Sequence, residues 1–137
     1  MARAAFRLTA PVVREHPLHK QIADVFRLEL APPGRVSRDG VVWWAVDISA
    51  YAGVAPGLRT TRGVIAGIPD LFVLHRGKAH MLEIKAADGV LSSAQQAVAA
   101  AVLAGGGLVG VVRNAGEALG CLDAWRIPRN RRVKVAA

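Results

Sequence analysis

The stretch GIPDLFVLHRGKAHMLEIKAADGVLSSAQ, residues 67–95, decides the fold, because it predicts two strands and the start of a helix. Its two apolar runs, at 70–74 and 79–85, are joined by the short connection HRGK, whose glycine is typical of a hairpin turn. Ser92 and Gln95 follow with the spacing of a capping box. We therefore expect an antiparallel hairpin and then a helix.

The segments before this hairpin predict a helix, a strand and a loop. Apolar residues recur at helical spacing over 15–30 and predict an amphipathic helix there. VVWWAVDI, at 41–48, is rich in β-branched and aromatic residues and predicts a strand, and 49–66 predicts a loop. Because neighbouring side chains of a strand point to opposite faces, we expect one ring of the pair Trp43 and Trp44 in the core and the other outside it.

The segments after the hairpin predict a helix, a third buried strand and a last short helix. The helix that begins at Ser92 runs through an alanine-rich stretch to Ala104, and LVGVVR at 108–113 predicts the strand. Asn114 and Glu117 repeat the capping-box pattern before a helix that reaches about Trp125. The order helix, three or four strands, helix, strand, helix indicates an α/β fold with a mixed central sheet flanked by helices.

Composition indicates one compact domain over 1–137 and a polyanionic partner. The chain has 137 residues, of which 53% are hydrophobic, so it can bury one real core. Its formal net charge of +8 favours nucleic acid over a membrane surface as the partner. The basic tail, 126–137, places five Lys or Arg within RIPRNRRVKV, and we expect it to be mobile.

Cysteine content and hydropathy indicate a cytoplasmic protein. Cys121 is the only cysteine, which excludes an intrachain disulfide and a zinc finger and fits a reducing cytosol. No stretch reaches the run of about eighteen apolar residues that a membrane helix needs. The start of the sequence also lacks the apolar core of a signal peptide, so we expect neither export nor a membrane partner.

Three charged residues of the hairpin suggest a metal site. Alternation along a strand places Glu83 and Lys85 on the same face, and Asp70 can approach Glu83 across the hairpin. Two converging carboxylates are costly unless a cation lies between them, and Mg²⁺ or Mn²⁺ would accept both together with a backbone carbonyl. The alternative is a Glu83–Lys85 salt bridge with Asp70 as a turn residue after Pro69, and the spacing alone leaves both interpretations open.

GIPDL (67–71) and EIKAADGVLSSAQ (83–95) closely resemble the PD-(D/E)XK nuclease superfamily and, within it, the VRR-NUC family of phage and bacterial proteins. The resemblance covers about 15–125 and implies a restriction-endonuclease-like fold. It implies metal ligands and catalytic groups as follows: Asp70 and Glu83 as ligands, the backbone carbonyl of Ile84 as a third, Lys85 as the catalytic lysine, Gln95 near the scissile phosphate, and Glu15 as the first-helix acid that completes the site. Where the family carries an Asn and glycines after its second strand, this chain has AVDISAYAG, so that contact is in doubt.

Basic and polar residues in three places are candidates for contacts with DNA. Glu15 also has an ordinary role, because an acid in a first helical turn interacts favourably with the helix dipole. The arginines of the loop have one too, because surface loops often carry such residues without function. Gln95 can serve both as a cap and near a phosphate, because the start of a helix attracts anions. The candidate DNA contacts are Arg59 and Arg62 in the loop, Ser92 and Gln95 at the helix start, and Arg129, Arg131 and Arg132 in the tail.

The resemblance implies a metal-dependent, structure-specific DNA endonuclease. Small stand-alone relatives resemble junction-resolving enzymes that act as homodimers, so we expect branched DNA, such as a Holliday junction, as the substrate in DNA recombination or repair. Alternatives are a flap endonuclease, a restriction-type endonuclease, and a non-catalytic DNA-binding module with the same fold. The expected location is the cytoplasm or nucleoid of a bacterial host, with the chain encoded by the host or by a phage or prophage.

Overall fold

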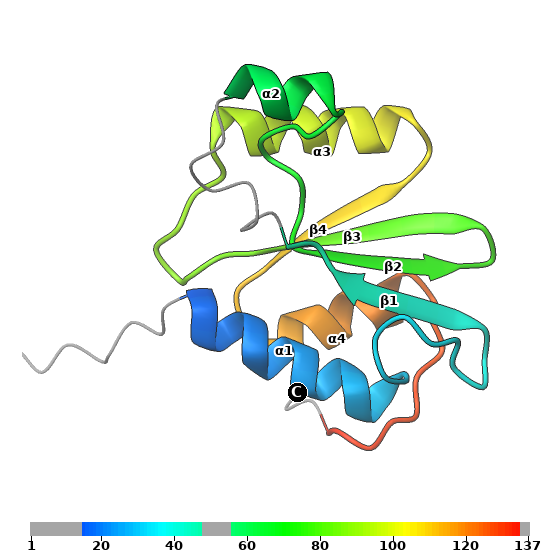
Figure 1. Cartoon of the computed structure of the whole chain (residues 1–137). Helices are drawn as coiled ribbons and strands as arrows, with labels where there is room; N and C mark the ends of the chain where they lie inside the picture. The colour runs from blue at the N-terminus through cyan, green and yellow to red at the C-terminus, as the bar shows by residue number, and fades with distance from the viewer. Residues whose placement is uncertain (1–14, 48–55, 135–137) are drawn as a thin grey trace, which may run out of the picture.

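The computed structural model describes residues 15–47 and 56–134 and shows a mixed α/β fold (Figure 1). This confirms the predicted α/β class and the sheet flanked by helices. Among the described residues, no helix combines the length and the apolar character needed to cross a membrane. The elements are α1 (Glu15–Glu29), β1 (Val41–Ala45), α2 (Pro56–Thr61), β2 (Leu71–His75), β3 (Lys78–Ile84), α3 (Ser93–Ala104), β4 (Leu108–Val112) and α4 (Ala115–Ala124).

The four strands form one sheet in the order β1-β2-β3-β4. The pairs β1–β2 and β2–β3 are antiparallel, and β3–β4 is parallel, because α3 carries the chain back before β4 begins. The hairpin pairs out to His75 and Lys78, so its turn consists of Arg76 and Gly77 alone, both with positive φ, 50° and 73°. Positive φ at both positions matches the twist of a two-residue hairpin turn.

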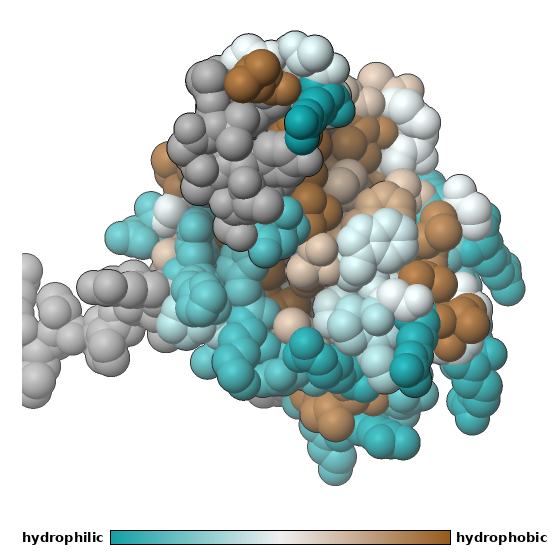
Figure 2. Space-filling model, in the orientation of Figure 1, coloured by the Kyte–Doolittle hydropathy of each residue, from teal (hydrophilic) through white to brown (hydrophobic). Residues whose placement is uncertain are grey.

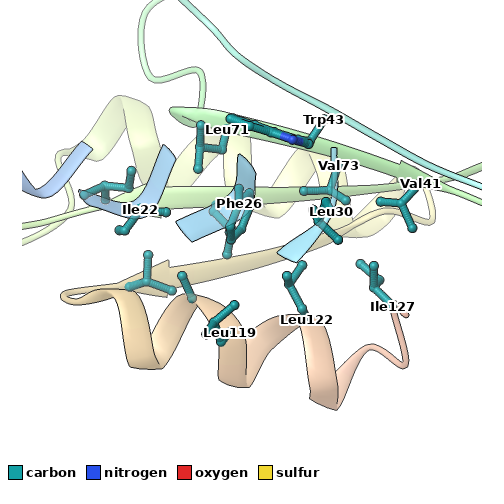
Figure 3. Close-up of a cluster of buried hydrophobic side chains, with 14 of the residues drawn as sticks. Ile22, Phe26, Leu30, Val41, Trp43, Leu71, Val73, Leu119, Leu122 and Ile127 are labelled. Carbon is teal, nitrogen blue, oxygen red and sulfur yellow. The ribbon is translucent and has the colours of Figure 1, made fainter. Parts of the chain in front are cut away.

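Helices α1 and α4 cover one face of the sheet and α3 the other (Figure 1). The core lies between the sheet and the pair α1–α4, where Ile22 and Phe26 of α1 meet Trp43 and the inward residues of β2 (Figure 3). These α1 residues are four apart, so they share one helix face, as the helical spacing predicted. The other buried hydrophobic residues are Leu18, Leu30, Val41, Leu71, Val73, Leu82, Ile84, Val112, Ala118, Leu119, Leu122 and Ile127.

The tryptophan pair behaves as predicted. Trp43 is 1% exposed, packs edge-on against Phe26, and donates its indole N–H to the Ala31 carbonyl at 2.7 Å. Trp44 is exposed and stacks on Phe72 of the neighbouring strand, with ring centroids 4.5 Å apart. A buried indole needs an acceptor, and the Ala31 carbonyl, just after the end of α1, supplies it.

Three predictions about local structure need correction. The loop predicted over 49–66 contains the short helix α2 at 56–61, and residues 48–55 lie outside the described part of the chain. The second capping pattern holds only in part. The side chain of Asn114 accepts from the N–H of Glu117, but the Glu117 carboxylate takes the N–H of Arg113 at 2.7 Å and not that of Asn114. The strand predicted over 41–48 is shorter than expected and ends at Ala45.

The expectation that the basic tail is mobile is wrong for 126–134. Glu29, at the end of α1, is fully buried, and Arg129 reaches its carboxylate at 3.0 Å with a side chain that is itself 5% exposed. The backbone N–H groups of Arg131 and Val133 also donate to Glu29. A buried carboxylate requires such partners, so the tail is folded against α1.

Arg129 therefore has an internal role and not the predicted contact with DNA. Its guanidinium bridges Glu29 and Asp123, at 3.0 Å and 2.9 Å. Both pairs use its donors within the protein, which leaves the side chain buried between α1 and the end of α4. Arg131 and Arg132 are exposed and remain available to a partner.

Candidate active site

Asp70 and Glu83 lie opposite each other at one end of the hairpin. Leu71 pairs with Leu82, so the next residues along each strand, Asp70 and Glu83, meet across the sheet. An oxygen of Asp70 accepts the backbone N–H of Ile84 at 2.7 Å, which fixes this carboxylate at the start of β2. Glu83 is only 4% exposed. The predicted approach of the two acids is thus present.

The environment of Glu83 raises its pKa to about 8. Burial is the largest cause, followed by the charge and hydrogen bond of Asp70, while Lys85 acts in the opposite direction. At neutral pH the pair therefore retains a proton unless a cation compensates its charge. Two hard oxygen donors with uncompensated charge fit a divalent cation such as Mg²⁺ or Mn²⁺.

Lys85 pairs with Glu15 and not with Glu83. Its ammonium lies 3.6 Å from the Glu15 carboxylate, and its side chain is 13% exposed. The ion pairs of the described residues do not include the predicted alternative, a direct Glu83–Lys85 bridge. Glu15 thus reaches the site from the first turn of α1, beside the charged face of β3.

Gln95 connects the helix α3 to the carboxylate pair. Its side-chain N–H donates to Glu83 at 3.0 Å, and its side-chain oxygen accepts the N–H of Ser92 at 2.9 Å. Ser92 in turn accepts the N–H of Gln95 through its hydroxyl, which completes the predicted capping box. The cap and the bond to Glu83 coexist, because one amide carries a donor and an acceptor, and a position near the scissile phosphate stays a prediction.

His19, one turn after Glu15, also reaches the carboxylates. Its Nε2 lies 3.6 Å from Asp70, and its ring is about one third exposed, at 36%. His19 is thus a partly exposed residue of α1 that also contacts one of the two carboxylates. Four elements, α1, β2, β3 and α3, therefore supply the candidate site.

The described residues contain no group of three or more His, Cys, Asp or Glu side chains arranged to hold a metal. The candidate ligand set is the pair Asp70 and Glu83, and the carbonyl of Ile84 stays a prediction. The N–H of Ile84, by contrast, is already engaged by Asp70. A hard divalent ion keeps several waters, so two protein carboxylates can suffice as its charged ligands.

Gly67 places the helix α3 against the start of β2. Its φ is +87°, and a Cβ at this position would lie 2.4 Å from the backbone carbon and oxygen of Ala94 and 2.7 Å from the N of Gln95. No side chain fits there, because both neighbours are backbone. The glycine of GIPDL thus allows the contact that brings Gln95 to Glu83.

We expect Gly67→Ala to lower both stability and any activity of this site. A left-handed φ costs an L-residue about 1–2 kcal/mol, and the close backbone contact must open as well. Denaturant unfolding checks the stability. The control is Gly120→Ala in α4, where nothing lies within 4 Å and alanine should stabilise by about 1 kcal/mol. Equal stability of the Gly67→Ala and parent proteins would contradict this prediction.

A groove that the sequence did not predict lies along α1, beside the site. A cavity of about 320 Å³ runs between α1 and the ends of β1 and β2. Figure 2 shows hydrophilic side chains gathered over α1. Positions 16, 20 and 27 follow helical spacing, and this charged stripe is the signal that could have revealed the groove. Its lining residues are His16, His19, Lys20, Ala23, Arg27, Ala45 and Leu71.

The predicted DNA contacts of the tail lie away from the carboxylates. Arg131 and Arg132 lie near the end of α1, whereas Glu15 begins it, and a helix of 15 residues is about 22 Å long. Arg62 is exposed after α2, and the side chain of Arg59 lies outside the described part of the structure. Among the predicted contacts whose side chains the structure describes, Gln95 bonds Glu83 and Ser92 bonds Gln95.

Comparisons with protein-family models, with curated proteins and with solved structures each return no match for this chain.

Proposed function

We propose that this protein is a metal-dependent DNA endonuclease of the VRR-NUC type, with a restriction-endonuclease-like fold. The observation that carries the proposal is Glu83, buried beside Asp70 with its pKa raised to about 8. Groups with strongly raised pKa values next to a like charge cluster at functional sites. A purely structural role would give Glu83 a cationic partner, but Lys85 bonds Glu15 instead.

The arrangement also follows the order that the family resemblance implies. Helix α1 contributes an acid, Glu15. Asp70 directly precedes β2, Glu83 lies in β3, Lys85 directly follows β3, and α3 begins with the capping box of Gln95. Asp70, Glu83 and Gln95 are joined by hydrogen bonds, and the charges of the Lys85–Glu15 ion pair act on Glu83. This convergence of distant sequence positions supports the residue roles, while the fold assignment remains part of the proposal.

Each residue has a definite chemical role in this proposal. Asp70 and Glu83 would hold the metal ion, which when bound supplies positive charge to the phosphate and lowers the pKa of a water. Lys85 places an ammonium beside them, where it orients water or neutralises charge that develops on the phosphate oxygens. Gln95 fixes the orientation of Glu83 through its amide. Glu15 holds Lys85 in place at 3.6 Å.

The groove along α1 supplies a path for the DNA backbone. Its basic side chains lead from the carboxylates, at His19, along the helix to Arg27. Lys20 and Arg27 share the carboxylate of Asp24, so one acid partly offsets two cations. The remaining charge and the net +8 of the chain favour a polyanion in this groove.

The substrate we propose is branched DNA, cut by a homodimer in the bacterial cytoplasm or nucleoid. One chain carries one carboxylate pair and can cut one strand. Resolution of a four-way junction needs paired cuts in opposing strands, which two-fold symmetry provides. The exposed Trp44, stacked on Phe72, offers apolar surface of the kind that subunit interfaces cover.

A cleavage assay on linear duplex, flap, splayed and four-way DNA tests this proposal. We expect cleavage only with Mg²⁺ or Mn²⁺, with the four-way junction cut fastest, and a dimer by light scattering at micromolar protein. Full activity in EDTA would refute the metal-dependent nuclease. A monomer that cuts flaps and spares junctions would refute the junction substrate but leave the nuclease proposal intact.

A further inference from the structure

A second cavity lies at the opposite end of the hairpin from the carboxylate pair. It has a volume of about 250 Å³ and forms where the β2–β3 turn meets the end of α4. Figure 1 shows this turn at the far end of the strands from the start of α1. The lining residues are His75, Arg76, Lys78, His80, Trp125 and Arg126.

This cavity is cationic, and its lining contains no acidic residue. Arg76, Lys78 and Arg126 are all exposed, and none of them takes part in the ion pairs found between described residues. Three uncompensated cations around one cavity repel one another. Their mutual repulsion would be relieved by an anion bound among them.

Arg76 and Arg126 occupy backbone positions that ordinarily favour glycine. Arg76 is the first residue of the two-residue hairpin turn, with φ 50°, and Arg126 has φ 57°. Arg126 follows the last turn of α4, where its N–H bonds the Asp123 carbonyl and the N–H of Ile127 bonds Leu122. That pattern is a Schellman motif, whose left-handed residue is usually glycine. A left-handed backbone conformation costs free energy at any residue other than glycine. Both arginines adopt it and line the same cavity, which indicates that their side chains have a function there.

The floor of the cavity is aromatic. Trp125 lies against His80, with ring centroids 5.2 Å apart and planes tilted by 36°. His80 is 3% exposed, and burial lowers its pKa, so the ring is neutral. A carbonyl only accepts, so Nδ1 carries the hydrogen donated to Val73 at 3.2 Å. The half-buried indole offers an apolar face on which a sugar or base can rest.

We propose that this cavity binds a phosphate group, carried on a nucleotide or on a nucleic acid strand, between Arg76, Lys78 and Arg126, with the adjoining sugar or base against Trp125. Arginine forks match phosphate oxygens in pairs, and lysine adds a point charge. A cavity of about 250 Å³ suits one nucleotide better than a larger ligand.

The phosphate site is separate from the proposed cleavage site. Lys78 and Glu83 are five residues apart on β3, which places them about 16 Å from each other. Their side chains also point to opposite faces of the sheet. Binding at the cavity therefore requires neither the metal nor cleavage of DNA, and the two proposals can fail independently.

The test uses the full chain and the double variant Arg76→Gly/Arg126→Gly. Glycine is favoured at both positions, so this variant should fold at least as stably as the parent while it loses two cations. The matched control is Arg35→Gly/Arg38→Gly, because it also removes two exposed arginines, both of which lie outside the cavity lining. The probes are inorganic phosphate, adenosine monophosphate and a short single-stranded oligonucleotide, all in EDTA.

The readouts are calorimetric affinity and the NMR signal of the Trp125 indole N–H, assigned with Trp125→Phe. We expect at least one probe to shift this signal, and the double variant to bind that probe about tenfold or more weakly, with little change in the control. Binding of the mononucleotide identifies a free nucleotide as the ligand, and binding of the oligonucleotide alone identifies a strand. The proposal would be overturned if no probe shifted the Trp125 signal, or if the control variant lost as much affinity for the probe as the double variant.

Discussion

Glu83→Gln is expected to reduce the rate of DNA cleavage at least about a thousandfold, or about 4 kcal/mol of transition-state stabilisation. The substitution keeps the shape and the acceptor for the Gln95 amide, which lies 3.0 Å from the Glu83 carboxylate, but removes the negative charge. Under the proposed function, we expect the site to lose its divalent cation together with that charge. DNA binding should persist, because the loss of a carboxylate reduces repulsion of the phosphate. Rates on junction DNA and a binding assay in EDTA measure the two effects.

The same variant should be more stable than the parent at alkaline pH in EDTA. An acid whose folded pKa is raised, here from 4.5 to about 8, binds more protons when folded, so its ionisation destabilises the protein as pH rises from 4.5 through 8. Glutamine does not ionise and avoids this penalty, which is about 4 kcal/mol at pH 8. Denaturant unfolding at pH 5 and pH 8 compares the two proteins.

The control for both effects is Asp39→Asn, which removes an acid that faces only Arg38 at the surface, at 3.8 Å. Surface pairs of this kind contribute about 0–1 kcal/mol, so we expect neither activity nor pH dependence to change. Retained cleavage in Glu83→Gln would exclude Glu83 from the active site. Loss of cleavage in both variants would indicate a nonspecific effect of charge.

Arg129→Met is expected to lower the free energy of unfolding by about 3–5 kcal/mol. The substitution leaves the fully buried carboxylate of Glu29 without the guanidinium that lies 3.0 Å away. Methionine fills most of the space but offers no donor, so the charge stays buried and incompletely paired. Arg132→Met removes an exposed charge from the same segment and should change stability by less than about 0.5 kcal/mol. Equal stability of the two variants would contradict the structural role of Arg129.

The pH dependence of stability should reflect the same cluster. Burial acts to raise the pKa of Glu29, but the N–H of Val133, the Arg129 guanidinium and the N–H of Arg131 outweigh it and hold this pKa below 4.5. The stabilisation is therefore complete above pH 4.5 and is lost as pH falls through the lowered value. In Arg129→Met this acid-labile contribution should shrink, which unfolding curves between pH 3 and pH 6 would show.

The sequence allowed the hairpin and its carboxylates to be predicted because their signals are local. Alternation along β3 and the capping box at Ser92 depend on neighbours a few residues apart, and both agree with the structure. The burial of Trp43 and the exposure of Trp44 follow from the same alternation. The pairing of Asp70 with Glu83 needed only a short turn to fix the register.

What the sequence did not reveal depends on contacts between distant residues. The tail was predicted to be mobile because its arginines look like a solvated charge run, and their partner, Glu29, is 100 residues away. Lys85 likewise pairs with Glu15, which is distant in the sequence, and not with the nearby Glu83. The cationic cavity joins a hairpin turn to a helix end, and no local pattern relates Arg76 to Arg126.

The bonds between Glu29 and the segment 129–133 also set the order in which the molecule can be completed. A ribosome synthesises the chain from its N-terminus, so α1 emerges long before Val133, which follows Glu29 by 104 residues. Until that segment arrives, docking of α1 on the sheet would bury an unpaired charge. Glu15 and His19 lie on the same helix, so their contacts with Lys85 and Asp70 would also form only after residue 133 has been made.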